Sequence, residues 1–317
     1  MRSGAQTLVL LATPLTGPLL RALSTGPKQQ AELRREVGLP AQTTLRAQLK
    51  RLTANAIVEK RRRDRFPGAL QYELTVAGRE LLFVAETVER WLERAPGGPL
   101  ELGGAAAKAA GRALAEGWST TMLRALAARS LTLTELDSVI TTLNYPTLDR
   151  RLSAMRLAGL AEACEGTGPG TPYGVTGWAC HGIGPLLASM HWERRHAAAE
   201  TAPVAKLDIE AAFLLAAALL SAPADVSGSC RLAVELRNGQ GHTLAGLLVA
   251  VNDGRVTSSA TRLEGSVDAW ASGGLPAWFT ALIDGDPAGL ELGGDGTLAR
   301  ATVECLHSAL FDLAIFN

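Results

Sequence analysis

Cations gather in two neighbouring stretches near the amino end of the chain, and they are the side chains best suited to chemistry. Across the first stretch, residues 41–55, polar and basic side chains recur on one side of an expected helix: Gln42, Thr43, Arg46, Lys50 and Arg51. The second stretch, residues 57–75, adds five cations: Lys60, Arg61, Arg62, Arg63 and Arg65. Since Lys and Arg bind phosphate oxygens and guanine edges, this pattern favours a polyanion, and double-stranded DNA above all.

A predicted helix-turn-helix positions the first stretch. Residues 28–37 are expected to be helical, Gly38-Leu39-Pro40 forms a tight turn, and residues 41–55 form the next helix. Three leucines of this last helix recur at helical spacing and should be buried: Leu45, Leu49 and Leu52. Any amphipathic helix has a polar outer face, so it is the preceding turn that favours a helix entering the major groove.

The second stretch lies on a predicted β-hairpin. Residues 57–62 and 70–75 have strand character, and residues 63–68 form the turn between them. A basic hairpin directly after a helix-turn-helix is typical of a wing that follows the phosphate backbone. We therefore predict that residues 1–96 form a winged helix-turn-helix module that contacts DNA.

The same pattern recurs 103 residues further along the chain. Leu20–Leu23 reappears as Leu123–Leu126, and the register predicts a second winged helix over residues 97–200. The buried leucines are kept or replaced by Met155, but Arg46, Lys50 and Arg51 become Asp149, Ser153 and Ala154. Since carboxylates repel phosphates, we expect the second module to be a weaker DNA contact, a dimerisation surface or part of a ligand site.

The end of the first module resembles the HxlR and MarR kinds of winged-helix regulator. Residues 72–78 hold a Tyr-x-Leu-Thr-x-x-Gly pattern at a strand end, and the long helix expected after it closes with Val-Glu-Arg-Trp at residues 88–91. The resemblance covers about residues 7–94 and implies a dimeric transcription regulator. Many HxlR-type proteins begin with a Cys-containing stretch, but the first cysteine here is Cys164, so no thiol sensor is expected at that place.

Residues 201–317 are predicted to form a separate α+β domain with an antiparallel sheet. A helix over residues 207–221 precedes a meander of three strands, at residues 230–236, 243–251 and 255–260. Three helical segments are expected after the meander, at residues 268–270, 276–279 and 298–311.

Short motifs in this last segment resemble the sterol carrier protein type 2-like fold over about residues 205–315. The motifs are Val256-Thr257, Gly265–Trp270, Ile283–Pro287, Leu290–Asp295 and Leu306–Phe311. The resemblance implies an apolar tunnel for lipids or other hydrophobic molecules. Candidate wall residues are Phe213, Trp270, Trp278 and Phe279, although each aromatic side chain taken alone is better explained as core filling.

Composition and charge narrow the function. The formal net charge is zero, yet residues 1–95 hold 16 Lys and Arg against nine Asp and Glu, whereas residues 201–317 hold six against 13. The basic end suits a polyanion. The four cysteines lie far apart without metal-ligand spacing, and no nucleophile–base or carboxylate pair stands out, so no cofactor, metal ion or catalytic site is predicted.

The amino end lacks a cleavable signal pattern, and the longest apolar run, Ala211–Leu220, is shorter than the roughly 18 residues of a membrane span. A cytoplasmic location without membrane contact is expected.

Taken together, the sequence predicts a multidomain α+β protein with two tandem winged-helix modules, 1–96 and 97–200, and an α+β domain, 201–317. The favoured function is a homodimeric transcription regulator that binds an operator and responds to a hydrophobic small molecule. Two alternatives stay open. One is a protein that sequesters a hydrophobic metabolite or drug and uses its winged helices to bind proteins; the other is an enzyme that uses a carboxyl-terminal cavity.

Overall fold

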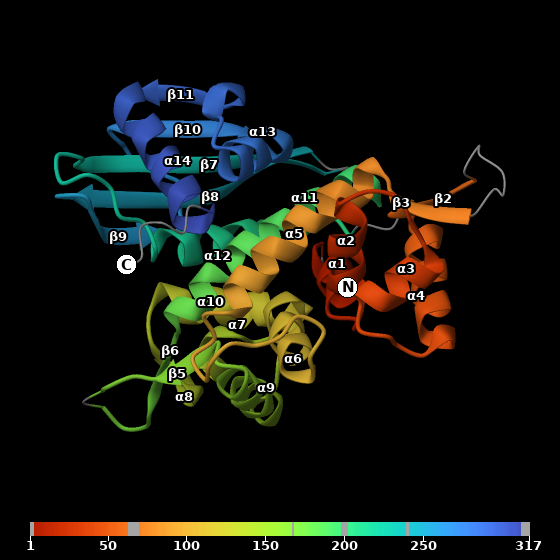
Figure 1. Ribbon diagram of the computed structural model, residues 1–317. Helices are drawn as coiled ribbons and strands as arrows, with labels where there is room; N and C mark the ends of the chain where they lie inside the picture. Colours follow the sequence, from red (N-terminus) through yellow and green to blue (C-terminus); the bar gives the residue numbers. More distant parts are fainter. Residues whose placement is uncertain (1–2, 63–69, 167, 198–201, 239–240, 312–317) are drawn as a thin grey trace. The chain divides into compact units, whose positions relative to one another are not determined.

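Helices and three β-sheets make up the protein in a computed structural model that describes residues 3–62, 70–166, 168–197, 202–238 and 241–311 (Figure 1). The chain divides into two compact units. One unit holds Gly4–Arg112 and Ala188–Thr201, and the other holds Met1–Ser3, Ala113–Leu187 and Ala202–Asn317. The mixture of helix and sheet agrees with the predicted fold class.

The first set of elements runs from residue 5 to residue 92. It consists of α1 (Ala5–Leu11), α2 (Thr16–Ser24), β1 (Lys28–Gln29), α3 (Gln30–Glu36), α4 (Gln42–Ala54), β2 (Val58–Arg62), β3 (Leu70–Leu74) and α5 (Val76–Leu92). The strands form an antiparallel sheet in the order β1-β3-β2. The predicted helix-turn-helix and the strands of its hairpin are confirmed, but residues 28 and 29 are a short strand rather than the start of a helix.

Local interactions explain where α3 and α4 begin and end. The Glu32 carboxylate accepts a hydrogen bond of 2.6 Å from the backbone N–H of Gln29, which satisfies a free donor at the start of α3. After α3, Gly38 and Leu39 both adopt positive φ, and this left-handed turn redirects the chain into α4. The three leucines predicted to be inward, Leu45, Leu49 and Leu52, are buried.

The Thr-x-x-Gly part of the strand-end pattern has a structural cause. Thr75 Oγ1 accepts a hydrogen bond of 3.1 Å from the backbone N–H of Gly78, which caps α5. The same hydroxyl donates to the backbone carbonyls of Ala56 and Ile57, at the start of the hairpin. A Cβ atom on Gly78 would collide with the carbonyl oxygen of Ile57, so α5 approaches the hairpin at a distance that only glycine permits.

A second set of elements follows in the same order, up to residue 196. It consists of α6 (Ala105–Ala115), α7 (Gly117–Ala128), β4 (Leu131–Thr132), α8 (Leu133–Val139), α9 (Tyr145–Leu157), β5 (Ala161–Ala163), β6 (Pro172–Val175), α10 (Gly177–His181) and α11 (Ile183–His196). The strand order is β4-β6-β5. The bounds of α8 and α9 are those of α3 and α4 moved by 103 residues.

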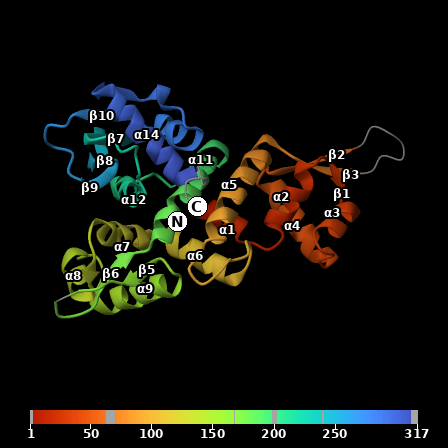
Figure 2. The same ribbon diagram turned by 60° about the vertical axis from the view of Figure 1, so that its left-hand side comes forward.

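The remaining elements form an α+β arrangement around a five-stranded sheet (Figure 2). They are α12 (Lys206–Ala217), β7 (Gly228–Asn238), β8 (Gly241–Asn252), β9 (Arg255–Ala260), β10 (Ala269–Gly274), α13 (Leu275–Phe279), a π-helical turn η2 (Thr280–Asp284), a 3₁₀ turn η3 (Pro287–Gly289), β11 (Glu291–Gly294) and α14 (Gly296–Phe311). The sheet order is β11-β10-β7-β8-β9, α14 packs on β10 and β7, and α12 packs on β8. The predicted antiparallel meander is confirmed in β7, β8 and β9.

Two predictions for this sheet are wrong. Residues 269 and 270, expected to be helical, belong to β10, and β10 pairs with β7 in parallel, so the sheet is mixed rather than antiparallel. The cause is that burial alternates with a period of two residues, as in a strand: Ala269 and Ala271 are fully buried, whereas Trp270 and Ser272, which alternate with them, are half-buried. The packing of these alternating side chains therefore determines the strand, and the helix propensity of the short Asp-Ala-Trp stretch does not.

An ion pair connects α12, which packs on the sheet, to α7 of the second set within one compact unit. Arg124 of α7 donates a hydrogen bond of 2.6 Å from Nε to the carboxylate of Glu210 in α12. Glu210 is almost fully buried, and Arg124 also donates to Thr261 Oγ1 at 3.2 Å. A buried carboxylate is costly without such a partner, so this pair fixes α12 on α7.

Among the residues that the structure describes, no single helix has the length and apolar character needed to cross a membrane. The helices α1 and α2 have that length and character only when counted together, and they are bent by 81° relative to each other.

Candidate nucleic-acid interface

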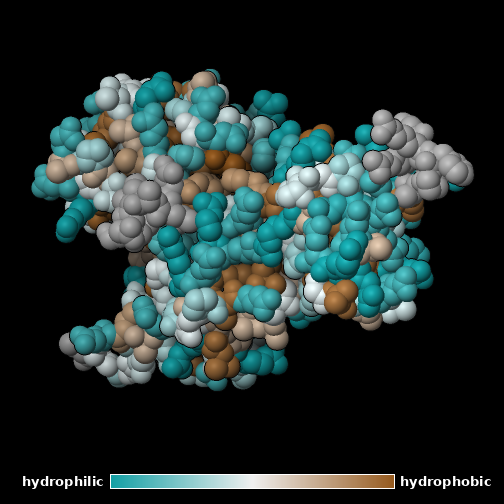
Figure 3. All heavy atoms as spheres, in the orientation of Figure 1, coloured by the Kyte–Doolittle hydropathy of each residue, from teal (hydrophilic) through white to brown (hydrophobic). Residues whose placement is uncertain are grey.

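The outward face of α4 carries the side chains predicted to contact DNA. All five of them are exposed: Gln42, Thr43, Arg46, Lys50 and Arg51. Gln42 and Thr43 lie in the first turn of α4, and the three cations follow toward its end. The surface over α3 and α4 is mainly hydrophilic in Figure 3. The helix thus presents short polar groups first and cations after them, which is the arrangement expected of a helix in the major groove.

The three cations of α4 differ in their freedom. Arg51 donates a hydrogen bond of 2.9 Å from Nη1 to Thr13 Oγ1, in the turn between α1 and α2. Within the described part of the chain, Arg46 and Lys50 form no hydrogen bond or ion pair. Arg46 and Lys50 are therefore the α4 cations that can turn toward a ligand without losing a contact inside the protein.

A buried side chain that the sequence analysis missed holds α4 in place. Gln48 lies on the inward face of α4 between Leu45 and Leu49, and its amide donates a hydrogen bond of 2.8 Å to Thr16 Oγ1 at the start of α2. Glutamine is usually exposed, so a sequence alone gives no signal that this one is internal.

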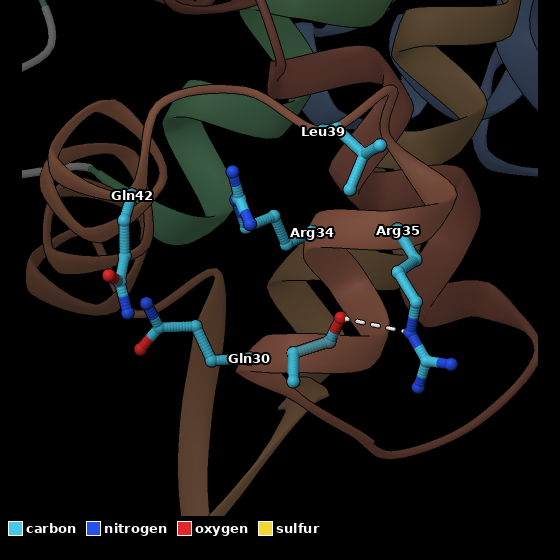
Figure 4. A pocket seen from close by; sticks show the side chains of 6 residues that line it. Gln30, Arg34, Arg35, Leu39 and Gln42 are labelled. Atoms are coloured by element: carbon cyan, nitrogen blue, oxygen red, sulfur yellow. Dashed lines mark hydrogen bonds between the residues drawn. The ribbon is translucent and has the colours of Figure 1, made fainter.

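A groove opens between α3 and the start of α4 (Figure 4). It has a volume of about 560 Å³ and is lined by Gln30, Ala31, Arg34, Arg35, Leu39 and Gln42. Figure 4 shows the side chains of Gln30 and Gln42 pointing toward one another across it. Gln30 Nε2 is buried and has no hydrogen-bond partner among the described residues, so the groove contains a donor that is not satisfied by the protein.

Two arginines of α3 extend the basic surface beyond the predicted residues. Arg34 and Arg35 are both exposed, and Arg34 Nε donates a hydrogen bond of 2.9 Å to the carbonyl of Pro40, which fixes the turn between the helices. Arg35 Nε lies 3.4 Å from the carbonyl of Ala31. Two consecutive arginines just before the turn were the available signal for this part of the surface.

The hairpin presents its described cations on both faces of β2. Lys60, Arg61 and Arg62 are exposed, and Lys60 Nζ lies 5.9 Å from the centre of the Tyr72 ring. Arg61 is partly neutralised, because its Nε is 2.9 Å from the Glu59 carboxylate and 3.3 Å from that of Glu73. Arg63 and Arg65 were also predicted to contact DNA, and they lie outside the described residues.

The second set keeps the core of this arrangement but not the positions of its cations. Leu148, Leu152 and Met155 are buried on α9, as their counterparts are on α4. The positions that match the three α4 cations hold Asp149, Ser153 and Ala154, and all three are exposed. Arg150, Arg151 and Arg156 give α9 three positive charges at other positions of the helix.

The aromatic residues predicted to line a ligand site lie in two different places. Phe213 and Trp278 meet edge to face with their ring centres 5.1 Å apart, and Trp278 Nε1 donates a hydrogen bond of 2.9 Å to the carbonyl of Ala233. Both are buried, as is Phe279. Trp270 is half-buried and packs over Gly293, on the sheet face opposite the buried alanines of β10. Their binding of a ligand stays a prediction.

The cysteines and acidic groups form no site of their own within the described residues. No group of His, Cys, Asp and Glu there could hold a metal ion, and all four cysteines are free thiols. Burial raises the pKa of the Cys180 and Cys230 thiols to about 11. Both thiols are therefore protonated and unreactive near neutral pH.

Comparison with known proteins places the basic surface in a known domain. Residues 14–96 match the profile of the HxlR-like helix-turn-helix family. The crystal structure of diamide-treated YodB from B. subtilis is 28% identical and covers 28% of this chain and 88% of the YodB chain, with a TM-score of 0.27. No curated protein matches the chain. Residues 14–96, which include α2 to α5, are thus an HxlR-like helix-turn-helix domain.

Proposed function

We propose that this protein regulates transcription by binding double-stranded DNA through the HxlR-like domain alone. In this proposal α4 enters the major groove, where Gln42, Thr43 and Arg46 meet base edges, and Lys50 and Arg51 meet phosphates. The β2–β3 hairpin follows the phosphate backbone with the cations of residues 60–65. The observation that carries the proposal is the outward face of α4, which is exposed and cationic on a helix whose inward face is fixed by burial.

We further propose that the second set is a diverged winged helix that supports the first rather than reading DNA. Its support is the loss of the three matching cations on α9 while the buried positions are kept. The described residues of the second hairpin also hold no Lys or Arg, whereas β2 of the first hairpin carries Lys60, Arg61 and Arg62. The proposed division of the chain is therefore 1–96 for DNA binding, 97–200 for support and 201–317 for effector binding.

The third part of the proposal is a hydrophobic effector that binds the α+β part of the chain. The resemblance to the sterol carrier protein type 2-like fold and the aromatic side chains near the sheet support it. Because α12 is joined to α7 by the partly buried Arg124–Glu210 pair, a change at the sheet would be passed to the second set. The effector can alter DNA affinity only by as much as it prefers one conformation over the other.

Salt dependence of DNA binding tests the main proposal. The full chain would be titrated onto labelled duplex from upstream of its own gene, at about 50 and 200 mM salt, with unrelated duplex as competitor. With six or more phosphate contacts, affinity should fall by roughly a thousandfold or more between these conditions. Absence of binding at the lower salt concentration would contradict the proposal and favour the sequestering function instead.

A further inference from the structure

The end of α11 packs onto the first set, although more than 90 residues separate it from α5. Residues Ala188–Thr201 belong to the same compact unit as Gly4–Arg112. Trp192 of α11 is buried, and its Nε1 donates a hydrogen bond of 2.8 Å to the carbonyl of Ala77 in the first turn of α5. In both views the end of α11 lies beside α5 (Figures 1 and 2).

The next residue of α11 holds the start of α1. The Glu193 carboxylate accepts hydrogen bonds of 2.6 Å from the backbone N–H of Gly4 and 2.8 Å from that of Thr7. Glu193 is buried, and the N–H groups at a helix start have no partner inside the helix. A carboxylate is the favoured partner there because it also meets the positive end of the helix dipole.

Polar contacts continue at the last turn of α11. Glu80 of α5 lies 3.3 Å from Arg195 and 2.8 Å from His196 Nε2. The contact with α1 and α5 is therefore made by four of the residues between 192 and 196: Trp192 and Glu193 are buried, His196 is half-buried and Arg195 is exposed. Such a contact is a fixed part of the unit rather than a loose approach.

By the repeat, α10 and α11 together are the counterpart of α5. Thr75 caps α5 and Thr176 caps α10 in the same way, each accepting from the N–H three residues on and donating to a carbonyl at the start of its hairpin. Because the second hairpin is shorter, the shift between the two copies falls from 103 to 101 residues after it. With this shift Thr75 matches Thr176, and Trp91 near the end of α5 matches Trp192. Within one compact unit, the end of α11 thus packs on the start of the helix to which it is equivalent by the repeat.

A helix that packs on its own counterpart is the contact by which two identical subunits form a twofold dimer. The resemblance to HxlR-type regulators implied a homodimer of this protein. We infer instead that the end of α11 covers the surface of α5 on which a second subunit would pack, so that the 317-residue chain is a monomer in solution. Resting on the proposed function, the inference extends to DNA: one chain, in which α4 is the proposed reading helix, binds a single half-site rather than a palindrome.

The mass of the full chain in solution is the first test. Sedimentation velocity and mass photometry should give 33.2 kDa across the concentration range used for DNA binding. A stable dimer of twice that mass would overturn the inference. This measurement needs no DNA, so it decides the inference even when the proposed function fails.

Stoichiometry on DNA is the second test. The mass of the complex on the upstream duplex should correspond to one chain per duplex, and halving a palindromic site should leave affinity unchanged within about twofold. If every complex instead contains two chains per duplex, and affinity is lost on the halved site, the inference is overturned while the proposed function remains intact.

A substitution tests whether the α11 contact is what removes the dimer surface. Trp192→Ala should uncover α5 and produce species heavier than the monomer as concentration rises, and Arg194→Ala is the matched control because Arg194 is exposed on the same helix. Trp192→Phe, which keeps the ring, should stay monomeric. If Trp192→Ala stays monomeric and as resistant to protease as the control, the contact does not have this role; if it does not fold, the mass of the unmodified chain decides.

Discussion

The side-chain amide of Gln48 donates a hydrogen bond of 2.8 Å to Thr16 Oγ1, and the Thr16 hydroxyl donates in turn to the carbonyl of Leu10 at 2.9 Å. Both side chains are buried. The series joins the inward face of α4 to the start of α2 and to the end of α1. Since each member is satisfied by the next, this polar series fixes the orientation of α4, the helix that carries the cations proposed to contact DNA.

We predict that Gln48→Leu destabilises the protein. The substitution keeps an apolar side chain of similar length but leaves Thr16 without its donor in a buried place, which costs about 1–3 kcal/mol. Urea unfolding followed by circular dichroism measures the free energy of unfolding. Thr44→Ala, at an exposed position of the same helix, is the control and should lie within about 0.5 kcal/mol of the unmodified chain. Equal stability of the two variants would show that the buried series contributes nothing.

Two glycine substitutions should change the stability of the fold in opposite directions. Gly78→Ala forces a Cβ atom against the Ile57 carbonyl, and the backbone of α5 or of the hairpin must move, so we expect a loss of several kcal/mol or failure to fold. Gly111→Ala lies inside α6, where a Cβ atom meets no described atom within 4 Å, and should raise stability by about 0.5–1 kcal/mol. Thermal unfolding of both variants distinguishes them, and a tolerated Gly78→Ala would refute the close approach of α5 to the hairpin.

Much of the fold could be predicted because its local signals agree with its packing. The leucine spacing in α4 and α9, the turn at Gly38 and the hairpin strands are all local patterns, and each is present in the structure. The strand β10 could not be predicted in the same way. Its parallel partner β7 is nearly 40 residues away, and only burial of Ala269 and Ala271 against α14 makes the alternation visible.

The four cysteines should react with a thiol reagent at different rates. Burial raises the pKa of Cys180 and Cys230 from 9.0 to about 11, so both stay protonated in the folded chain at pH 8. Iodoacetamide at that pH should modify half-buried Cys164 first and leave these two intact, as read by peptide mass spectrometry. Modification of all cysteines at one rate would contradict their burial.

The same two thiols give stability a pH dependence. Unfolded, they ionise near 9.0, but folded they hold the proton up to about 11. The unfolded state therefore gains a favourable ionisation that the folded state lacks, and the free energy of unfolding should fall as pH rises from about 9 to about 11. Replacing both residues, Cys180→Ala and Cys230→Ala, should flatten this part of the curve.

The cations of the candidate interface could be predicted from the sequence, but the residues with which the interface side chains form ion pairs and hydrogen bonds could not. Arg46 and Lys50 follow from helical spacing alone. The neutralisation of Arg61 depends on the register that sets Glu59 opposite Glu73 on β3, and a sequence does not give that register directly. The internal place of Gln48 likewise depends on Thr16, 32 residues earlier in the chain.

Arg46→Ala should weaken DNA binding strongly and leave the fold intact. Arg46 is exposed and makes no described contact inside the protein, so its removal costs the folded state little, whereas loss of a bidentate base contact costs about 1–3 kcal/mol of binding. Fluorescence anisotropy with labelled duplex measures the change. Asp149→Ala, at the matching place on α9, should leave affinity unchanged. Unchanged binding by Arg46→Ala would remove α4 from the interface.

The hairpin supplies the converse experiment, a substitution that should tighten binding. Glu59 and Glu73 are direct cross-strand neighbours, and Arg61 lies within ion-pair distance of both. Like charges facing each other across two strands destabilise a sheet, and exposed ion pairs contribute only about 0–1 kcal/mol, so Glu59→Gln should change stability little. It would leave Arg61 with one carboxylate instead of two.

DNA affinity at low salt should therefore rise in Glu59→Gln. If Arg61 then contacts a phosphate, the slope of log affinity against log salt should steepen by about 0.9. Glu162→Gln is the matched control, since Glu162 holds the corresponding place on β5 and is exposed. Equal tightening by both substitutions would mean that overall charge rather than the β2–β3 hairpin governs binding, and it would assign the second set an equal share in DNA contact.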